Sequence, residues 1–206
     1  MPLNIEPGTA NGDFTPYAKY NSKAGRWYTK TDDGVEVEVA NLVAIADLEN
    51  ISIGWVFFAE GEAPDAVWAR NGTVPPRPSK DHKRGFRVLL FSQKNLFGVR
   101  EFTSTAGGTI AAMKALYDGQ FENAPERKRG LVPLIKCVRV TPEKTKHGTN
   151  FVPVFQIIKW TSRPAELQNQ NLAVTPQRSR RDELDDDIPG FEDPVKPTVN
   201  PSDDEY

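Results

Sequence analysis

Apolar and polar positions alternate in several short runs of this chain, which is the pattern of half-buried β-strands. Residues 26–31 and 35–39 alternate in this way, and Asp32-Asp33-Gly34 between them supplies a tight turn, so together they predict a β-hairpin. Residues 51–58 are mostly apolar and predict a strand that is covered on both faces. Further strands are predicted at residues 86–91, 97–102, 131–140 and 150–160.

One segment has helical rather than strand periodicity. A helix is expected over residues 106–117, with Ser104 or Thr105 as its N-cap and Asp118-Gly119 at its end. Its apolar side chains fall at helical spacing: Ile110, Met113, Leu116 and Tyr117. No other stretch has a comparable helical pattern, so a low helical content is expected.

Proline marks the longest expected connection. Residues 60–85 contain Val74-Pro75-Pro76-Arg77-Pro78, and so much proline predicts a long loop or flap without strand or helix. Residues 141–148 predict the long, basic tip of a second hairpin, formed by the last two predicted strands. Trp55 and Trp160 lie in apolar strands and are expected to anchor the core.

Roughly seven short strands with one helix predict a mainly β fold. A closed Greek-key barrel removes exposed strand edges, and the OB-fold, a small barrel with one helix, matches this pattern. A β-sandwich is the alternative. The OB-like domain is expected over residues 21–165, between an irregular arm over 1–20 and a basic and polar linker over 166–181. Residues 182–206 predict a disordered acidic tail.

The charge of the chain changes sign near its C-terminal end. Residues 1–181 carry 25 Lys and Arg against 18 Asp and Glu, a formal +7. Residues 182–206 carry 10 acidic residues against Lys196, a formal −9, and the two parts give the net charge of −2. A basic body suggests a polyanionic partner, because cations that neutralise phosphates release counterions. An acidic tail can compete for the same surface or dock elsewhere.

Composition narrows the class of protein. The chain has one cysteine, Cys137, and two widely spaced histidines, His82 and His147, which argues against a disulfide framework and a zinc site. No metal or cofactor is expected. No apolar run approaches the ~20 residues that span a bilayer, and residues 1–6 lack the regions of a signal peptide. We therefore expect a soluble protein of the cytoplasm.

The most cationic part of the body is residues 70–100, which hold eight Lys and Arg against Asp81. Single-stranded nucleic acid requires cations for its backbone and aromatic faces for its unstacked bases. The predicted backbone contacts are Arg77, Lys80, Lys83, Arg84, Arg87 and Lys94. The predicted stacking side chains are Phe86, Phe91 and Phe97. The alternative is that these phenylalanines fill the core and the charges lie on a solvated flap.

Two further groups of residues fit the same chemistry. Arg26, Tyr28 and Lys30 share one face of an alternating strand and would form a cation–aromatic–cation platform. Lys144 and Lys146 lie in the predicted hairpin tip, where they could close over a strand of nucleic acid. For the first group, the alternative is an ordinary half-exposed strand. For the hairpin tip, the alternative is that its charges only keep the protein soluble.

The tail resembles a known peptide motif. Its segment Asp185-Asp186-Asp187-Ile188-Pro189-Gly190-Phe191 resembles the acidic tip of bacterial single-stranded DNA-binding proteins, which ends in acidic residues followed by Ile-Pro-Phe. Here Gly190 separates Pro189 from Phe191, and the motif lies 15 residues before the end of the chain. The last residues, Asp203-Asp204-Glu205-Tyr206, resemble the tails of phage single-stranded DNA-binding proteins. In that family the tip is captured by replication and repair proteins.

The body also resembles phage-encoded OB-fold single-stranded DNA-binding proteins. Residues 151–160, followed by Arg163-Pro164, are similar to the last strand of such proteins. The resemblance implies a replication or recombination accessory of the bacterial or infected-host cytoplasm that coats exposed single strands without sequence preference. It also implies that the acidic tail docks partner proteins, and it leaves assembly into a homo-oligomer open.

No residues indicate catalysis. The chain lacks a Gly-x-x-x-x-Gly-Lys phosphate loop, its densest carboxylates lie in the tail, and Cys137 lies within a predicted strand. We therefore expect a protein that is not an enzyme. The main alternative function is a self-assembling structural or protein–protein adaptor β-domain. A second alternative is an RNA-binding module, because base stacking does not distinguish RNA from DNA.

Overall fold

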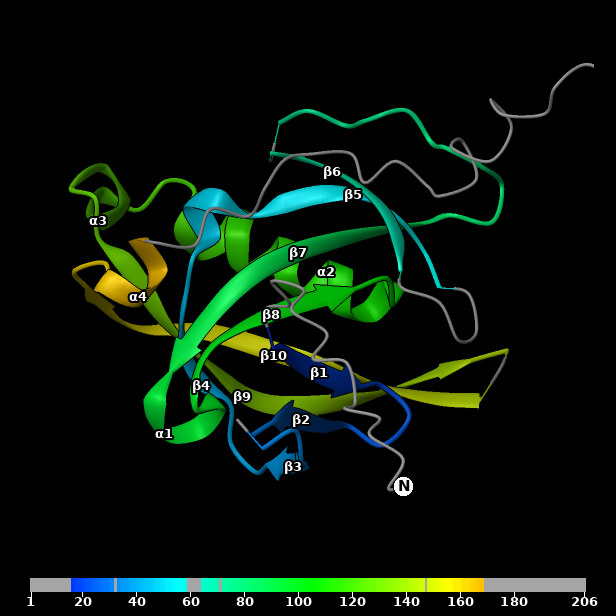
Figure 1. Ribbon diagram of the computed structural model, residues 1–206, viewed down its shortest axis with the longest axis horizontal. Coiled ribbons are helices and arrows are strands. Elements are labelled where there is room, and N and C mark those ends of the chain that lie inside the picture. The colour runs from blue at the N-terminus through cyan, green and yellow to red at the C-terminus, as the bar shows by residue number, and fades with distance from the viewer. Residues whose placement is uncertain (1–15, 32, 59–63, 71, 147, 169–206) are drawn as a thin grey trace, which may run out of the picture. The chain divides into compact units, whose positions relative to one another are not determined.

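The computed structural model describes residues 16–31, 33–58, 64–70, 72–146 and 148–168. This part of the chain is mainly β, with ten strands in one hydrogen-bonded sheet and a few short helices (Figure 1). The strands are β1 Tyr17–Asn21, β2 Arg26–Lys30, β3 Glu36–Val39, β4 Val43–Ala46, β5 Ser52–Phe57, β6 Asp65–Arg70, β7 Lys83–Ser92, β8 Gly98–Ser104, β9 Val132–Thr145 and β10 Gly148–Thr161. The helices are η1 Leu48–Asn50, α1 Gln93–Leu96, α2 Gly107–Leu116, the π-helical turn η2 Tyr117–Phe121, α3 Pro125–Lys128 and α4 Ala165–Gln168.

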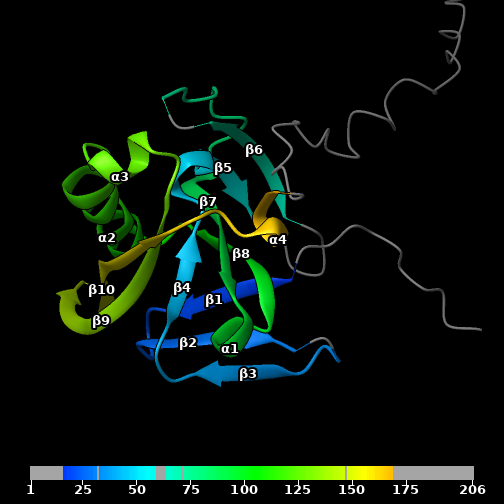
Figure 2. The ribbon, with the colours of Figure 1, turned by 90° about the vertical axis from the view of Figure 1, so that its left-hand side faces the viewer.

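The sheet follows the order β10-β9-β4-β7-β8-β1-β2-β3, and β5 and β6 branch from β7. Neighbouring strands are antiparallel except β1 and β8, which are parallel. Figure 2 shows β1, β2 and β3 side by side. Among the described residues no pairing joins β3 to β10. The mainly β class is therefore confirmed, the sheet of the described residues is not closed, and the OB-like Greek-key architecture stays a prediction.

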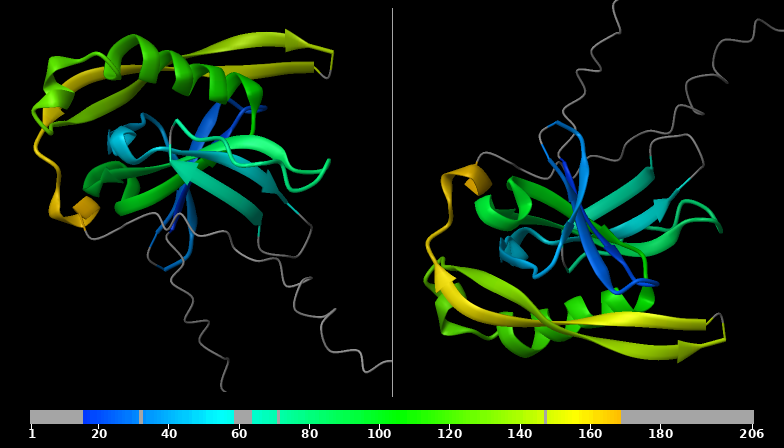
Figure 3. Two further views of the ribbon diagram at one scale, coloured as in Figure 1. Left: turned by 90° about the horizontal axis from the view of Figure 1, so that it is seen from above. Right: turned by 90° about the horizontal axis from the view of Figure 1, so that it is seen from below.

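The main core is built around Trp27 on β2, which is 4 % exposed. The rings of Tyr20, Phe102 and Phe155 surround its indole at centroid distances of 4.8, 4.9 and 5.9 Å. Helix α2 lies along the β9–β10 hairpin (Figure 3) and buries Met113 against the same core. The predicted helical stripe is confirmed, because its apolar spacing faces this core.

Three segments that were expected to be irregular are strands. β1 begins at Tyr17, inside the predicted arm, and buries Ala18 between β2 and β8. β6 occupies part of the predicted loop, because the proline cluster starts only at Pro75 and leaves the pairing of β6 with β5 intact. β9 continues to Thr145, so most of the predicted hairpin tip is strand.

Helix α2 differs from the prediction at both ends. Its N-cap is Ala106, and Ser104 Oγ accepts a hydrogen bond from the Ala106 N–H at 3.3 Å instead of capping the helix. The helix does not end at Asp118-Gly119 but continues through η2. The continuation buries Phe121, whose ring stacks on Trp160 with centroids 5.9 Å apart. Trp160 is half-buried and packs against the core.

The predicted linker over residues 166–181 begins with an ordered residue. Leu167 in α4 is 1 % exposed and packs against Leu89 and Val99 on the sheet. Residues 1–15 and 169–206, which include the rest of the linker and the acidic tail, lie outside the described residues. Among the helices that are described, none has the length and apolar character needed to cross a membrane.

Candidate nucleic-acid interface

Strands β5 and β6, residues 83–87 of β7 and the loop over residues 72–82 form a unit that we call the wing (top of Figure 1). β5 pairs with β6 along its whole length and with β7 on its other side. Trp55 lies opposite Val67, and Trp68 lies opposite Gly54. Because side chains alternate along a strand, the two indoles lie on opposite faces of the wing.

Trp55 lies beneath the proline-rich loop. The Arg77 guanidinium lies 5.2 Å from the centroid of its ring, which is a cation–π contact. The indole N–H donates a hydrogen bond to the Pro75 carbonyl at 2.9 Å. Trp55 is half-buried and belongs to none of the buried core clusters of the described residues. The prediction that it anchors the core is therefore wrong.

The loop is stabilised mainly by its own groups. Arg77 donates hydrogen bonds from Nε to the His82 carbonyl at 3.0 Å and from its guanidinium to the Lys80 carbonyl. His82 is 4 % exposed, and its Nδ1 shares a hydrogen bond with Ser79 Oγ at 2.9 Å. Its Nε2 lies 3.3 Å from Asp65 Oδ2 on β6, within ion-pair distance. These contacts tie the C-terminal end of the loop to the sheet.

Exposed cations gather on the wing. Five of its Lys and Arg side chains are exposed, and none of them forms an ion pair with a described residue: Arg70, Arg77, Lys80, Lys83 and Arg84. Arg84 lies directly opposite Trp55 on β7. The predicted backbone contacts Lys80, Lys83 and Arg84 thus lie in the same unit as the half-buried Trp55, and Arg84 shares its face of the sheet.

Arg87 has a different environment from its neighbours. Its guanidinium lies over the Trp68 ring at 5.2 Å, and its side chain is 13 % exposed. Burial lowers the pKa of Arg87, and Glu101, 3.9 Å away, partly offsets that effect. Trp68 itself is 8 % exposed and packs on Val56. The structure therefore gives Arg87 a packing role, which does not favour its predicted contact with a nucleic-acid backbone.

The three predicted stacking phenylalanines are not on the wing surface. Phe86 is 4 % exposed and packs in the core against Phe102, so its prediction as a stacking residue is wrong. Phe91 is half-buried and packs with Leu89 beside α4. Phe97 is 41 % exposed, but it follows α1 at the opposite end of β7 from the wing. The exposed Lys94 lies in that same helix, away from the other predicted cations.

The β2 platform shares one face, as predicted, but carboxylates are interleaved with its cations. Arg26 forms an ion pair with Glu38 at 2.9 Å, and Tyr28 lies directly opposite Glu38 on β3. Lys30 lies opposite Glu36 and its ammonium group is 5.5 Å from the Tyr17 ring. Because these carboxylates offset the cations, the β1–β3 face is expected to attract a polyanion less strongly than the wing does.

The other predicted cations lie near the end of the β9–β10 hairpin. Lys144 and Lys146 are both exposed, and Lys144 pairs in register with Thr149. Pro142 on β9 and Pro153 on β10 have no backbone N–H to donate. Prolines in these strands therefore disfavour pairing of the hairpin with a further strand.

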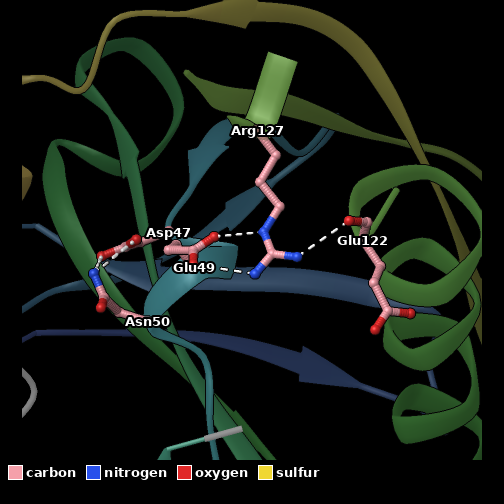
Figure 4. Close-up of polar contacts among 5 residues, drawn as sticks. All are labelled: Asp47, Glu49, Asn50, Glu122 and Arg127. Carbon is pink, nitrogen blue, oxygen red and sulfur yellow. Dashed lines mark hydrogen bonds and ion pairs between the residues drawn. The ribbon is translucent and has the colours of Figure 1, made fainter. Parts of the chain in front are cut away.

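A second polar cluster joins η1 to α3 (Figure 4). Arg127 donates to both carboxylate oxygens of Glu49, at 2.7 and 3.1 Å, and to the main-chain carbonyl of Glu122 at 3.1 Å. Asp47, 1 % exposed, accepts two hydrogen bonds from Asn50 and forms an ion pair with Arg163. Among the described residues no three His, Cys, Asp or Glu side chains are arranged to hold a metal ion. The cluster acts structurally, because its guanidinium groups are already paired.

Replacing Arg127 by Ala is expected to raise the pKa of Glu49 toward its ordinary value. The Arg127 hydrogen bond is the largest cause of the lowered pKa of Glu49, while burial opposes it. Since the folded pKa is depressed, this pair stabilises the fold above the unfolded pKa, and the contribution is lost as pH falls through the folded value. Carboxyl NMR titration measures the shift. Arg129→Ala is the control, and an unchanged Glu49 pKa in Arg127→Ala would contradict the assignment.

No family model, curated protein or solved structure matches this chain. The function is therefore inferred from the chain's own side chains and their arrangement. Among the surfaces described, the wing combines several exposed cations with the half-buried ring of Trp55, whose exposed neighbour Arg77 covers it. In the η1–α3 cluster Arg127 and Arg163 are ion-paired, and on the β1–β3 face Arg26 is paired with Glu38.

Sequence reasoning missed the role of the wing tryptophans. Trp55 is predicted to anchor the core because the residues around it are apolar, and Trp68 falls within the predicted loop over residues 60–85. One signal could have revealed β6: the apolar run Ala66-Val67-Trp68-Ala69, with two residue types that favour strands, stands in front of the proline cluster. No comparable local signal pairs Arg77 with Trp55, because that contact depends on how the loop folds back.

Proposed function

We propose that this protein binds single-stranded DNA with little sequence preference and coats strands exposed during replication or recombination. The observation that carries the proposal is the wing, where Arg84 lies opposite Trp55 on the same face of the sheet and Arg70, Lys80 and Lys83 are also exposed. Cations of this kind neutralise phosphates and release counterions, and an indole face accepts any base. Binding by such a surface is expected to be insensitive to sequence.

The wing supports single strands in particular. Its aromatic group lies on a sheet surface beside cations, and a base reaches such a ring only when it is unpaired. A duplex keeps its bases stacked inside and offers phosphates alone, so it would use only the electrostatic part of the surface. We also propose that the sheet belongs to an OB-like Greek-key architecture. In this proposal the protein is not an enzyme and acts in the cytoplasm.

The acidic tail completes the proposal. With a formal charge of −9, residues 182–206 compete with DNA for the basic body when DNA is absent. When DNA displaces the tail, its motif around Ile188 and Phe191 and its last residues up to Tyr206 dock replication or recombination proteins. The same acidic residues would therefore cover the basic body when DNA is absent and bind partner proteins when DNA is present.

Ending the chain at Arg181 is expected to tighten its binding to a labelled single strand several-fold at low salt. Removal of the tail takes away a competing polyanion, and the gain is expected to shrink as salt screens the charges. Fluorescence anisotropy with a ~30-nucleotide strand, long enough to cover a site of this class, measures the difference between the full and shortened chains. Equal affinities at low salt would contradict self-competition, and no binding by either chain would contradict the proposed function.

A further inference from the structure

Trp55 lies on the sheet surface with one face toward the proline-rich loop. Its ring contacts the Arg77 guanidinium at 5.2 Å, and its N–H donates to Pro75. On the strands, its directly opposite neighbours are Val67 and Arg84. The ring therefore has sheet on one side and a cover made of the loop on the other.

This cover is weakly attached to the ring. Residues 72–74 and 76–81 are exposed, and the hydrogen bonds of Arg77 go to the loop's own carbonyls, at Lys80 and His82. At Trp55 itself the loop is held by one cation–π contact and one neutral hydrogen bond, both close to solvent. Stacking of a nucleobase on an indole is of equal or greater strength than such a contact.

We propose that Trp55 is a nucleobase site, in which one base of the bound strand replaces the Arg77 guanidinium on the indole face. This inference rests on the proposed function and names its binding residue. The ligand is an unpaired base of a polynucleotide, of any identity, because every base presents a π-face.

The neighbouring charges fit this exchange. Once displaced, Arg77 remains in the loop above the strand, where its guanidinium can pair with a phosphate. Arg84, opposite Trp55 on β7, lies beside the same ring and can take the adjoining phosphate. Without DNA the guanidinium keeps the indole covered, so the site presents no bare aromatic surface.

The exchange is tested in the full chain with Trp55→Leu and Trp55→Phe. The probe is a labelled ~30-nucleotide oligo-dT, followed by anisotropy and by quenching of intrinsic tryptophan fluorescence. Trp55→Leu is expected to weaken binding about 5- to 150-fold, and Trp55→Phe is expected to recover part of that loss. Both variants are expected to lose most of the quenching on DNA addition. Trp160→Phe is the control, because Trp160 is also half-buried but stacks on Phe121 outside the wing.

The outcomes separate this site from the proposed function. If the wild-type chain binds DNA and both Trp55 variants bind with unchanged affinity and quenching, the nucleobase site is wrong and the function stands. If the wild-type chain does not bind, the function and this site both fall. Should Trp55→Leu fail to fold, Trp55→Phe decides: full quenching overturns the site, and lost quenching with retained binding supports it.

Discussion

Replacing Lys80, Lys83 and Arg84 together by Ala is expected to weaken binding to a single strand about 100-fold at ~0.1 M salt. Each phosphate contact contributes about −0.7 to the slope of log K against log salt for single strands, so the slope is expected to shrink by about 2. These side chains are exposed and unpaired with any described residue, so their loss should leave the fold intact. Salt-dependent anisotropy titrations measure both quantities.

A matched control removes equal charge elsewhere. Lys128, Arg129 and Lys159 are also exposed, and they lie on α3, just after it and on β10, outside the wing. Their joint replacement by Ala changes the net charge by the same amount and is expected to alter affinity far less. Equal losses in both triple variants would show that binding is diffuse and would contradict a binding surface on the wing.

Replacing Gly54 by Ala is expected to destabilise the protein by about 3 kcal/mol, because overpacking forces the backbone to move. A Cβ at Gly54 would lie 1.9 Å from the Val67 carbonyl oxygen and 2.9 Å from Trp68 Cε3. Relief requires separating β5 from β6, which is the ribbon that carries both wing tryptophans. Urea denaturation followed by fluorescence measures the change in the free energy of unfolding.

Gly119→Ala provides the comparison for this effect. Gly119 lies in η2, where an added Cβ would have no atom within 4 Å beyond its chain neighbours and the backbone of its own helix, and alanine is favoured over glycine in helices. Its replacement is expected to be neutral or slightly stabilising. A Gly54→Ala variant as stable as the wild type would show that β5 and β6 are not packed in the way described.

Much of the fold could be predicted from the local pattern of apolar and polar residues. β2, β3 and β5 follow from alternation or continuous apolar sequence, and α2 from its helical spacing. β6 was not predicted because the proline cluster that follows it is typical of a loop. A short edge strand needs only one partner, however, and β6 pairs with β5. β4 is four residues long and joins β7 to β9, so its identity depends on pairing rather than on local sequence.

The candidate site was predicted less completely than the fold. The cationic segment over residues 70–100 can be identified without a structure, because charge density is a property of the sequence. Which side of a strand is buried depends on tertiary packing: β7 is apolar on both faces, and Phe86 is directed to the core. For the same reason Arg87 and Arg100, counted with the basic segment, prove to be largely covered, at 13 % and 3 % exposure.

The central claim is tested most directly by titrating the full chain into a labelled ~30-nucleotide single strand and into its duplex, at ~50 and ~200 mM salt. We expect sub-micromolar binding that prefers the single strand at both salt concentrations and weakens steeply as salt rises. No binding, or equal and weak binding to both forms, would contradict the account and favour a self-assembling β-domain instead.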